Sequence, residues 1–132
     1  MLIHGYGSNE RDLFSLIDYF PIDSYVISLR APKELFNDSY AWYDIYLDSN
    51  NKFYDHDAAA RVRDELFHFI DDLSKSPNID SDNITLIGFS QGAILSHAIS
   101  FSYPEKIKNI IALSGVVAVS YTHLRAHETS ID

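Results

Sequence analysis

A serine flanked by two glycines is the residue of this chain best suited to nucleophilic chemistry. Residues 84–92 read Ile-Thr-Leu-Ile-Gly-Phe-Ser-Gln-Gly, a short apolar run that leads into a Gly-x-Ser-x-Gly pattern. The run predicts a strand of a buried parallel sheet, and Gly88 and Gly92 leave room for a sharp turn at Ser90. A hydroxyl held above the sheet edge by such a turn, a nucleophile elbow, attacks carbonyl carbon when a base removes its proton. We therefore predict that Ser90 is a nucleophile rather than a helix cap.

A glycine-bearing segment near the start of the chain is suited to the other half of such a site. Attack on a carbonyl creates an oxyanion, which needs two preorganised N–H donors. One donor is the backbone N–H of the residue after the nucleophile, here Gln91, and the second comes from a loop after an earlier strand. The segment His4-Gly5-Tyr6-Gly7 follows apolar residues 1–3, and the Tyr6 N–H is the expected second donor. The alternative is a glycine turn without chemistry.

Strands and helices alternate along the chain, which predicts the α/β class, with a central, mostly parallel sheet and helices on both faces. The expected strands, in their expected order across the sheet, are residues 25–29, 1–3, 84–88 and 110–113. Helices are expected over residues 9–20, over residues 57–74 and from residue 91 to near residue 104. The polar and aromatic residues 36–56 are interpreted as an excursion over the sheet edge.

Other residues that often do chemistry receive plainer interpretations. His68 and His97 fall too far along predicted helices to reach the serine, so surface or packing roles are expected. Asp55 and Asp57 come just before a helix, where acids are far more often caps or first-turn residues than metal ligands. No metal site is therefore predicted. Trp42-Tyr43 is equally compatible with the wall of a substrate pocket and with the core.

Length and composition exclude several classes of function. The chain has 132 residues, which is enough for one domain, and its formal net charge of −9 argues against nucleic-acid binding and against a polybasic membrane patch. No apolar run is long enough to cross a bilayer. There are no cysteines, so a disulfide framework and a cysteine nucleophile are excluded. We expect a cytoplasmic protein with a small-molecule substrate, and the oligomeric state stays open.

These motifs together resemble the phospholipase/carboxylesterase family of α/β-hydrolases, which includes acyl-protein thioesterases and small bacterial esterases. The resemblance covers about residues 1–115, and the matching segments occur in the family's order. They are Leu2-Ile3-His4-Gly5-Tyr6-Gly7-Ser8, Asp12-Leu13, Arg30-Ala31-Pro32, Trp42-Tyr43-Asp44, Gly88-Phe89-Ser90-Gln91-Gly92 and Leu113-Ser114-Gly115.

The resemblance implies a partial α/β-hydrolase fold and assigns catalytic or substrate-binding roles to residues of these motifs. It implies Ser90 as nucleophile and the Tyr6 and Gln91 N–H groups as oxyanion donors. It also implies substrate contacts from the remaining motif residues, namely His4, Gly5, Trp42 and Tyr43. The implied reaction is cofactor-free hydrolysis of carboxylic esters or thioesters with small to medium acyl chains.

Two departures from the family pattern limit what this chain is expected to do. Family members place a catalytic Asp and then a His after the Leu-Ser-Gly strand, yet only residues 116–132 follow Gly115. Between Ser90 and His123, the next histidine outside the serine's own helix, the only acid is Glu105. It is predicted at the wrong end of a parallel sheet for chemistry. A shortened triad would have to use the tail, from His123 or His127 with Glu128 or Asp132.

Residues 116–132 show no apolar periodicity and differ from the preceding domain. We therefore divide the chain into a partial hydrolase domain, residues 1–115, and a tail that does not look native. Family members also carry one or two strands before the His-Gly loop. We expect a chain truncated at both ends and inactive as written. The alternative is a non-catalytic α/β module that binds a small molecule in a cleft rich in Tyr and Trp.

Overall fold

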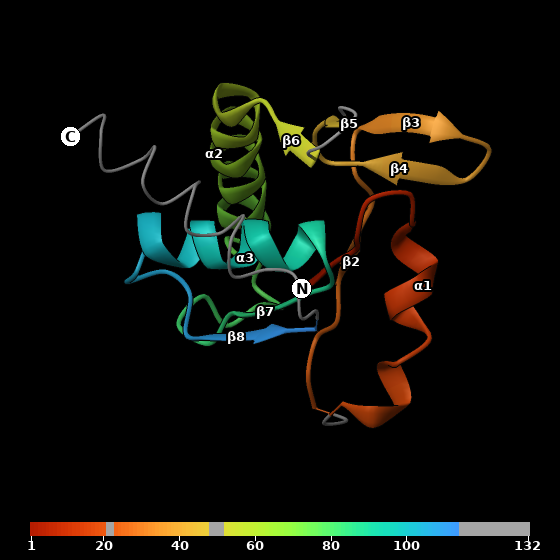
Figure 1. Cartoon of the computed structure of the whole chain (residues 1–132). Helices are drawn as coiled ribbons and strands as arrows, with labels where there is room; N and C mark the ends of the chain where they lie inside the picture. Colours follow the sequence, from red (N-terminus) through yellow and green to blue (C-terminus); the bar gives the residue numbers. More distant parts are fainter. Residues whose placement is uncertain (21–22, 48–51, 114–132) are drawn as a thin grey trace.

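A four-stranded parallel sheet forms the centre of the computed structural model, which describes residues 1–20, 23–47 and 52–113 (Figure 1). The order across the sheet is β2-β1-β7-β8, and every neighbouring pair is parallel. The strands are β1 (Leu2–Ile3), β2 (Ser28–Leu29), β7 (Thr85–Gly88) and β8 (Asn109–Ala112). The predicted strand order is confirmed, although β2 is shorter than the apolar run that predicted it.

The helices cover both faces of this sheet, as predicted. They are α1 (Glu10–Phe14), the 3₁₀ turn η1 (Ile17–Tyr19), α2 (His56–Leu73) and α3 (Gln91–Ser102). Successive strand residues point to opposite faces. Leu2 and Ile87 accordingly pack with Leu13 of α1, whereas Ile3 and Leu86 join the larger core under α2 and α3. In Figure 1, α2 and α3 lie together, away from α1.

Side-chain caps begin two of the helices. The Asn9 side chain accepts a hydrogen bond from the Arg11 N–H, and the Asp55 carboxylate accepts from the Asp57 and Ala58 N–H groups. Caps of this kind satisfy N–H groups that have no partner within the helix. The interpretation of Asp55 as a helix cap is thus confirmed.

The first helix is shorter than expected. Its α-helical part ends at Phe14, and residues 17–19 continue as a 3₁₀ turn rather than as one helix to residue 20. The Ser15 hydroxyl donates to the Asp12 carbonyl oxygen at 2.7 Å. Serine competes in this way with the regular backbone ladder, which accounts for the early end.

Two antiparallel hairpins, which were not predicted, lie within and just before the segment expected as an excursion. They pair β3 (Lys33–Phe36) with β4 (Ser39–Ala41) and β5 (Ile45–Leu47) with β6 (Lys52–Tyr54). Asp38 adopts φ 61° in the first turn, a conformation that Asp tolerates better than most residues. No helix among the described residues is long and apolar enough to cross a membrane.

Candidate active site

Ser90 stands on a strained turn between β7 and α3. Its φ of 54° and ψ of −114° lie outside the regions that L-residues normally occupy. The flanking glycines make this turn possible, since a Cβ on Gly88 would lie 2.3 Å from the Gly92 carbonyl oxygen. A Cβ on Gly92 would lie 1.9 Å from the Ile3 carbonyl oxygen. The Ser90 side chain makes no capping hydrogen bond to α3, so the helix-cap alternative has no support in the geometry.

The glycine loop after β1 lies against this turn. A Cβ built on Gly5 would sit 3.0 Å from the Phe89 carbonyl oxygen and 3.2 Å from the Ser90 Cβ. The first hairpin holds the far end of the loop, because the Gly7 N–H donates to the Tyr40 carbonyl oxygen at 2.8 Å. Residues far apart in sequence are therefore brought together at the carboxyl ends of β1 and β7, where ligands bind in open parallel sheets.

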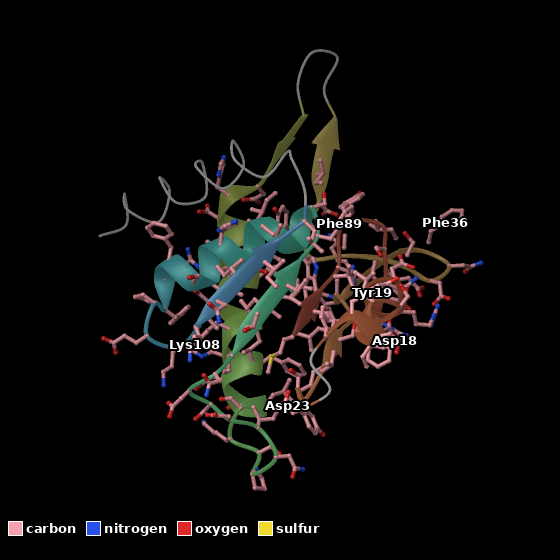
Figure 2. All side chains as sticks on the ribbon, turned by 90° about the horizontal axis from the view of Figure 1, so that it is seen from below. Asp18, Tyr19, Asp23, Phe36, Phe89 and Lys108 are labelled. Atoms are coloured by element: carbon pink, nitrogen blue, oxygen red, sulfur yellow. The ribbon has the colours of Figure 1, made fainter. Side chains whose placement is uncertain are left out.

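Two backbone N–H groups at this edge remain open to a ligand. Within the described part of the chain, neither the Tyr6 N–H nor the Gln91 N–H donates a hydrogen bond to another residue. Gln91 is also the first residue of α3, where the helix dipole favours negative charge. The side chains of Tyr6 and Phe89 are about half exposed beside them, and Figure 2 shows Phe89 where β7 meets α3.

The four residues expected to touch substrate are buried in the structure. His4 is 1% exposed, Trp42 4% and Tyr43 3%, and Gly5 is also buried. Trp42 and Tyr43 belong to the large core cluster, which favours the core interpretation of this pair over the pocket wall. Direct substrate contact by these residues stays a prediction, and their burial is compatible with roles in holding the site.

His4 is a neutral scaffold residue. Its Nε2 accepts a hydrogen bond from the Ala31 N–H at 3.0 Å, and its Nδ1 lies 2.8 Å from the Gly5 carbonyl oxygen. This pattern assigns the proton to Nδ1. Burial lowers the pKa of His4 below its usual 6.5, an effect that the Gly5 carbonyl partly opposes. An imidazole with both nitrogens engaged away from Ser90 is not its base.

Acidification should destabilise the fold through His4. Because its folded pKa lies below the unfolded value of 6.5, the unfolded chain binds more protons, and stability falls as pH drops below about 6.5. Urea unfolding of the His4→Gln variant at pH 7 and pH 5 should show a smaller loss of unfolding free energy than the unmodified chain. His68→Gln, an exposed position on α2, serves as the control. An unchanged pH dependence in His4→Gln would contradict the assignment.

The Gln91 side chain has a structural role that was not predicted. It is 1% exposed, its Oε1 accepts from the Trp42 N–H at 2.8 Å, and its Nε2 donates to the Tyr43 carbonyl oxygen at 2.9 Å. The sequence analysis assigns a role only to the Gln91 backbone N–H. The sequence signal that could have predicted this role is a long polar side chain in the first turn of a buried helix, because a buried polar group must find hydrogen-bond partners.

No base for Ser90 lies among the described residues. The Ser90 hydroxyl makes no hydrogen bond there, and His97 lies two turns along α3, as expected for a packing residue. Glu105 precedes β8, at the amino end of that strand, as predicted. The remaining candidates fall outside the described residues, namely His123, His127, Glu128 and Asp132.

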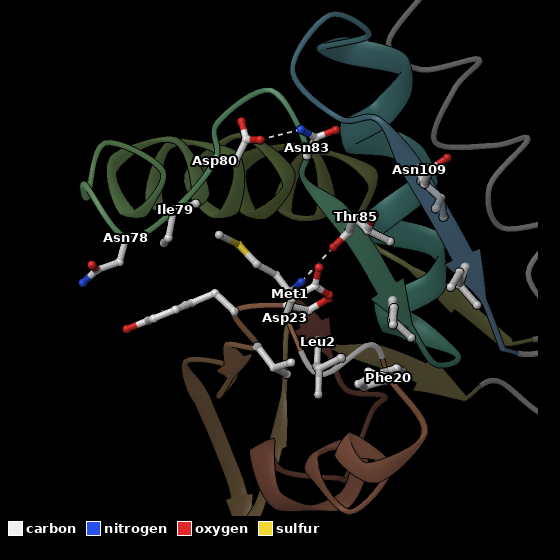
Figure 3. Close-up of a pocket in the computed structure, with 16 residues that line it drawn as sticks. Met1, Leu2, Phe20, Asp23, Asn78, Ile79, Asp80, Asn83, Thr85 and Asn109 are labelled. Atoms are coloured by element: carbon white, nitrogen blue, oxygen red, sulfur yellow. Dashed lines mark hydrogen bonds between the residues drawn. The ribbon is translucent and has the colours of Figure 1, made fainter.

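A cavity of about 770 Å³ opens at the opposite edge of the sheet (Figure 3). Met1, Thr85 and Asn109, near the amino ends of three strands, line it together with Asp80 and Asn83 of the loop before β7. Chemistry in open parallel sheets takes place at the carboxyl ends of the strands. This cavity is therefore separate from the edge that carries Ser90.

Comparisons with known proteins agree with this arrangement. The chain is 29% identical over 111 residues to "Putative hydrolase MhqD" of Bacillus subtilis (strain 168), a match over 84% of this chain and 54% of the relative. It is 34% identical over 80 residues to acyl-protein thioesterase 1 of Schizosaccharomyces pombe, over 61% of this chain and 35% of that protein. The crystal structure of the Bacillus cereus carboxylesterase superposes with a TM-score of 0.71 at 28% identity, covering 84% of this chain and 50% of the other.

The chain thus spans about half the length, or less, of the relatives it matches. The family model described as Phospholipase/Carboxylesterase matches residues 1–131. Sequence, sheet topology and the strained serine turn lead to the same assignment, with a hydrolase of the carboxylesterase or thioesterase type as the family function. The chain belongs to the phospholipase/carboxylesterase family of α/β-hydrolases.

Proposed function

We propose that Ser90 is the nucleophile of a serine hydrolase that cleaves carboxylic esters or thioesters with small to medium acyl chains. The observation that carries the proposal is the strained φ and ψ of Ser90 directly against the Gly5 loop. Strain of this kind costs on the order of 1–3 kcal/mol and persists where the surrounding structure enforces it. A hydroxyl fixed in this way needs no further ordering before it attacks.

In the proposed reaction, the Ser90 Oγ attacks the carbonyl carbon while a base takes the hydroxyl proton. The carbonyl oxygen becomes an oxyanion and accepts hydrogen bonds from the Tyr6 and Gln91 N–H groups, which are worth more in the tetrahedral state than in the ground state. The bond to the alcohol or thiol then breaks, and that group leaves with the proton. Water attacks the acyl-serine by the same route, releases the acid and restores Ser90.

The base and its orienting carboxylate are proposed to lie outside the residues that the structure describes. His4 is engaged on both ring nitrogens, and Glu105 lies at the amino end of β8. A serine hydroxyl without a base is a weak nucleophile at neutral pH. We therefore propose that the 132-residue chain alone is inactive or nearly so.

A fluorophosphonate probe tests both statements. Ser90 should be labelled in an extended protein, which carries the parent gene's own coding sequence after codon 115. In the 132-residue chain, labelling should be at least about 100-fold slower. Ser90→Ala should abolish labelling of the extended protein. Ser96→Ala, which removes a buried serine two turns along the same helix, should leave labelling intact.

Each other outcome has a clear meaning. Equal labelling of both lengths would refute the claim of inactivity, and its loss in His123→Ala or His127→Ala would locate the base in the tail. An extended protein that is not labelled at Ser90 and does not hydrolyse p-nitrophenyl acetate, yet binds small acyl esters with or without Ser90→Ala, would favour the binding module instead.

A further inference from the structure

We propose that the Gln91 carboxamide and the Trp42 indole are positioning residues that join the two halves of the oxyanion hole into one rigid unit. The inference rests on the proposed function, because it concerns how the Tyr6 and Gln91 N–H groups are held relative to each other. Neither side chain is required to touch substrate. Their effect is exerted through the backbone segment Tyr40–Tyr43, which we call the brace.

The first connection runs from the elbow to the brace. The Gln91 side chain accepts from the Trp42 N–H at 2.8 Å and donates to the Tyr43 carbonyl oxygen at 2.9 Å, in a site where Gln91 is 1% exposed. Both ends of the carboxamide are thus used, and neither bond competes with water. Gln91 therefore carries one proposed oxyanion donor on its backbone and is hydrogen-bonded to the brace through its side chain.

The second connection runs from the brace to the glycine loop. The Trp42 indole N–H donates to the His4 carbonyl oxygen at 2.7 Å, and the two rings pack with centroids 5.3 Å apart. The His4 ring in turn accepts from the Ala31 N–H, which fixes its orientation. Buried chains of hydrogen bonds of this kind reinforce one another where water is excluded.

The brace is hydrogen-bonded to the glycine loop on both sides of Tyr6. Trp42 holds His4, while Tyr40 exchanges two backbone hydrogen bonds of 2.8 Å, accepting from the Gly7 N–H and donating to the Ser8 carbonyl oxygen. Tyr6, the other proposed donor, lies between these two anchor points. The elbow also meets the start of the loop directly, because the Phe89 N–H donates to the Ile3 carbonyl oxygen at 3.1 Å and Gly92 lies close to the His4 carbonyl oxygen. The brace adds hydrogen bonds on both sides of Tyr6, at His4 and at Gly7 and Ser8.

Variants that cut one connection at a time test this arrangement in the extended protein. Gln91→Met keeps the volume and removes both side-chain hydrogen bonds, and Trp42→Phe keeps an aromatic ring and removes the bond to His4. The kcat for hydrolysis of p-nitrophenyl acetate should fall about 10- to 100-fold, and KM should change less than about twofold. The reason is that a donor misplaced by about 1 Å stabilises the transition state less and hardly affects binding of the substrate.

A second measurement needs no activity and uses the 132-residue chain. The backbone amide signal of Tyr6, identified in a ¹⁵N-tyrosine spectrum by its absence in Tyr6→Phe, should shift in Gln91→Met and in Trp42→Phe. The chain has a single tryptophan, so one indole N–H signal reports on the bond to His4. That signal should exchange with solvent faster in Gln91→Met than in the unmodified chain.

Tyr103→Phe is the matched control for stability. It removes a hydroxyl that donates to Asp64 at 2.9 Å, just beyond the far end of α3, and is expected to lower stability without moving kcat or the Tyr6 amide. If Gln91→Met does not fold, Trp42→Phe carries the test alone.

The outcomes separate the brace from the proposed function. An unmoved Tyr6 amide, an unchanged kcat, or an equal loss of kcat in Tyr103→Phe would each overturn the brace. An extended protein that hydrolyses no ester, combined with a shifted Tyr6 amide, would refute the proposed function and support the brace as the link between elbow and loop.

Discussion

Gly92→Ala is expected to leave the chain unable to fold. The added methyl group would sit 1.9 Å from the Ile3 carbonyl oxygen and 2.7 Å from that of His4. Both are backbone atoms, so the clash cannot be relieved by the movement of a flexible side chain. We expect a loss of more than about 4 kcal/mol of unfolding free energy, against a usual total of about 5–15 kcal/mol. The sign is opposite to helix propensity, which favours alanine over glycine by about 1 kcal/mol.

Thermal unfolding followed by circular dichroism, together with the soluble fraction on expression, measures this effect. Gly7→Ala is the matched control. Gly7 has φ of 81°, and a Cβ built there would make an ordinary van der Waals contact, 3.6 Å from the Ser39 Oγ. Only backbone strain of about 1–2 kcal/mol is therefore expected. A Gly92→Ala chain with an unchanged Tm would mean that α3 does not approach β1 as closely as the structure shows.

Ser90→Gly is expected to stabilise the fold while removing the proposed reaction. The φ and ψ of Ser90 mirror an ordinary extended conformation, so glycine adopts them freely. Relief of about 1–3 kcal/mol of strain outweighs the greater backbone entropy that glycine loses, about 0.5–1 kcal/mol. The net gain should be about 1 kcal/mol, which raises Tm by a few degrees. Ester hydrolysis by the extended protein should fall at least about 10³-fold.

Ser90→Ala distinguishes the two contributions. It removes the same hydroxyl but keeps the Cβ, so it should lose hydrolysis to the same extent without the gain in Tm. Equal melting temperatures for the glycine and alanine variants would show that the turn is not strained. Such a pair of measurements separates the conformational role of this position from its chemical role.

The elements that could be predicted from sequence are those set by local rules. The elbow was evident because Gly88 and Gly92 flank Ser90, and only residues without a Cβ fit the contacts found there. The caps at Asn9 and Asp55 follow from side chains that satisfy the free N–H groups of a helix start. The hairpin turn at Asp38 was a local signal that could have been read but was obscured by the mixed polar and aromatic composition around it.

The residues that hold the site escaped prediction because their partners are distant in the chain. The Gln91 carboxamide meets Trp42 across 49 residues, and the Trp42 indole meets the His4 carbonyl across 38. Sequence periodicity reports which face of an element is apolar, but not which polar atoms meet once the elements pack. The burial of His4 and Trp42, and the hydrogen bond that joins them, therefore could not be predicted from the sequence.

The sequence by itself determined the family, the strand order and the strained serine turn, because these depend on periodicity and on glycine stereochemistry. Only the tertiary structure decided that His4 is neutral and engaged, that Trp42 and Tyr43 lie in the core, and that Gln91 links elbow to loop. Each of these depends on buried hydrogen bonds between distant residues. A buried polar group must find a partner, and packing alone determines which partner lies within reach.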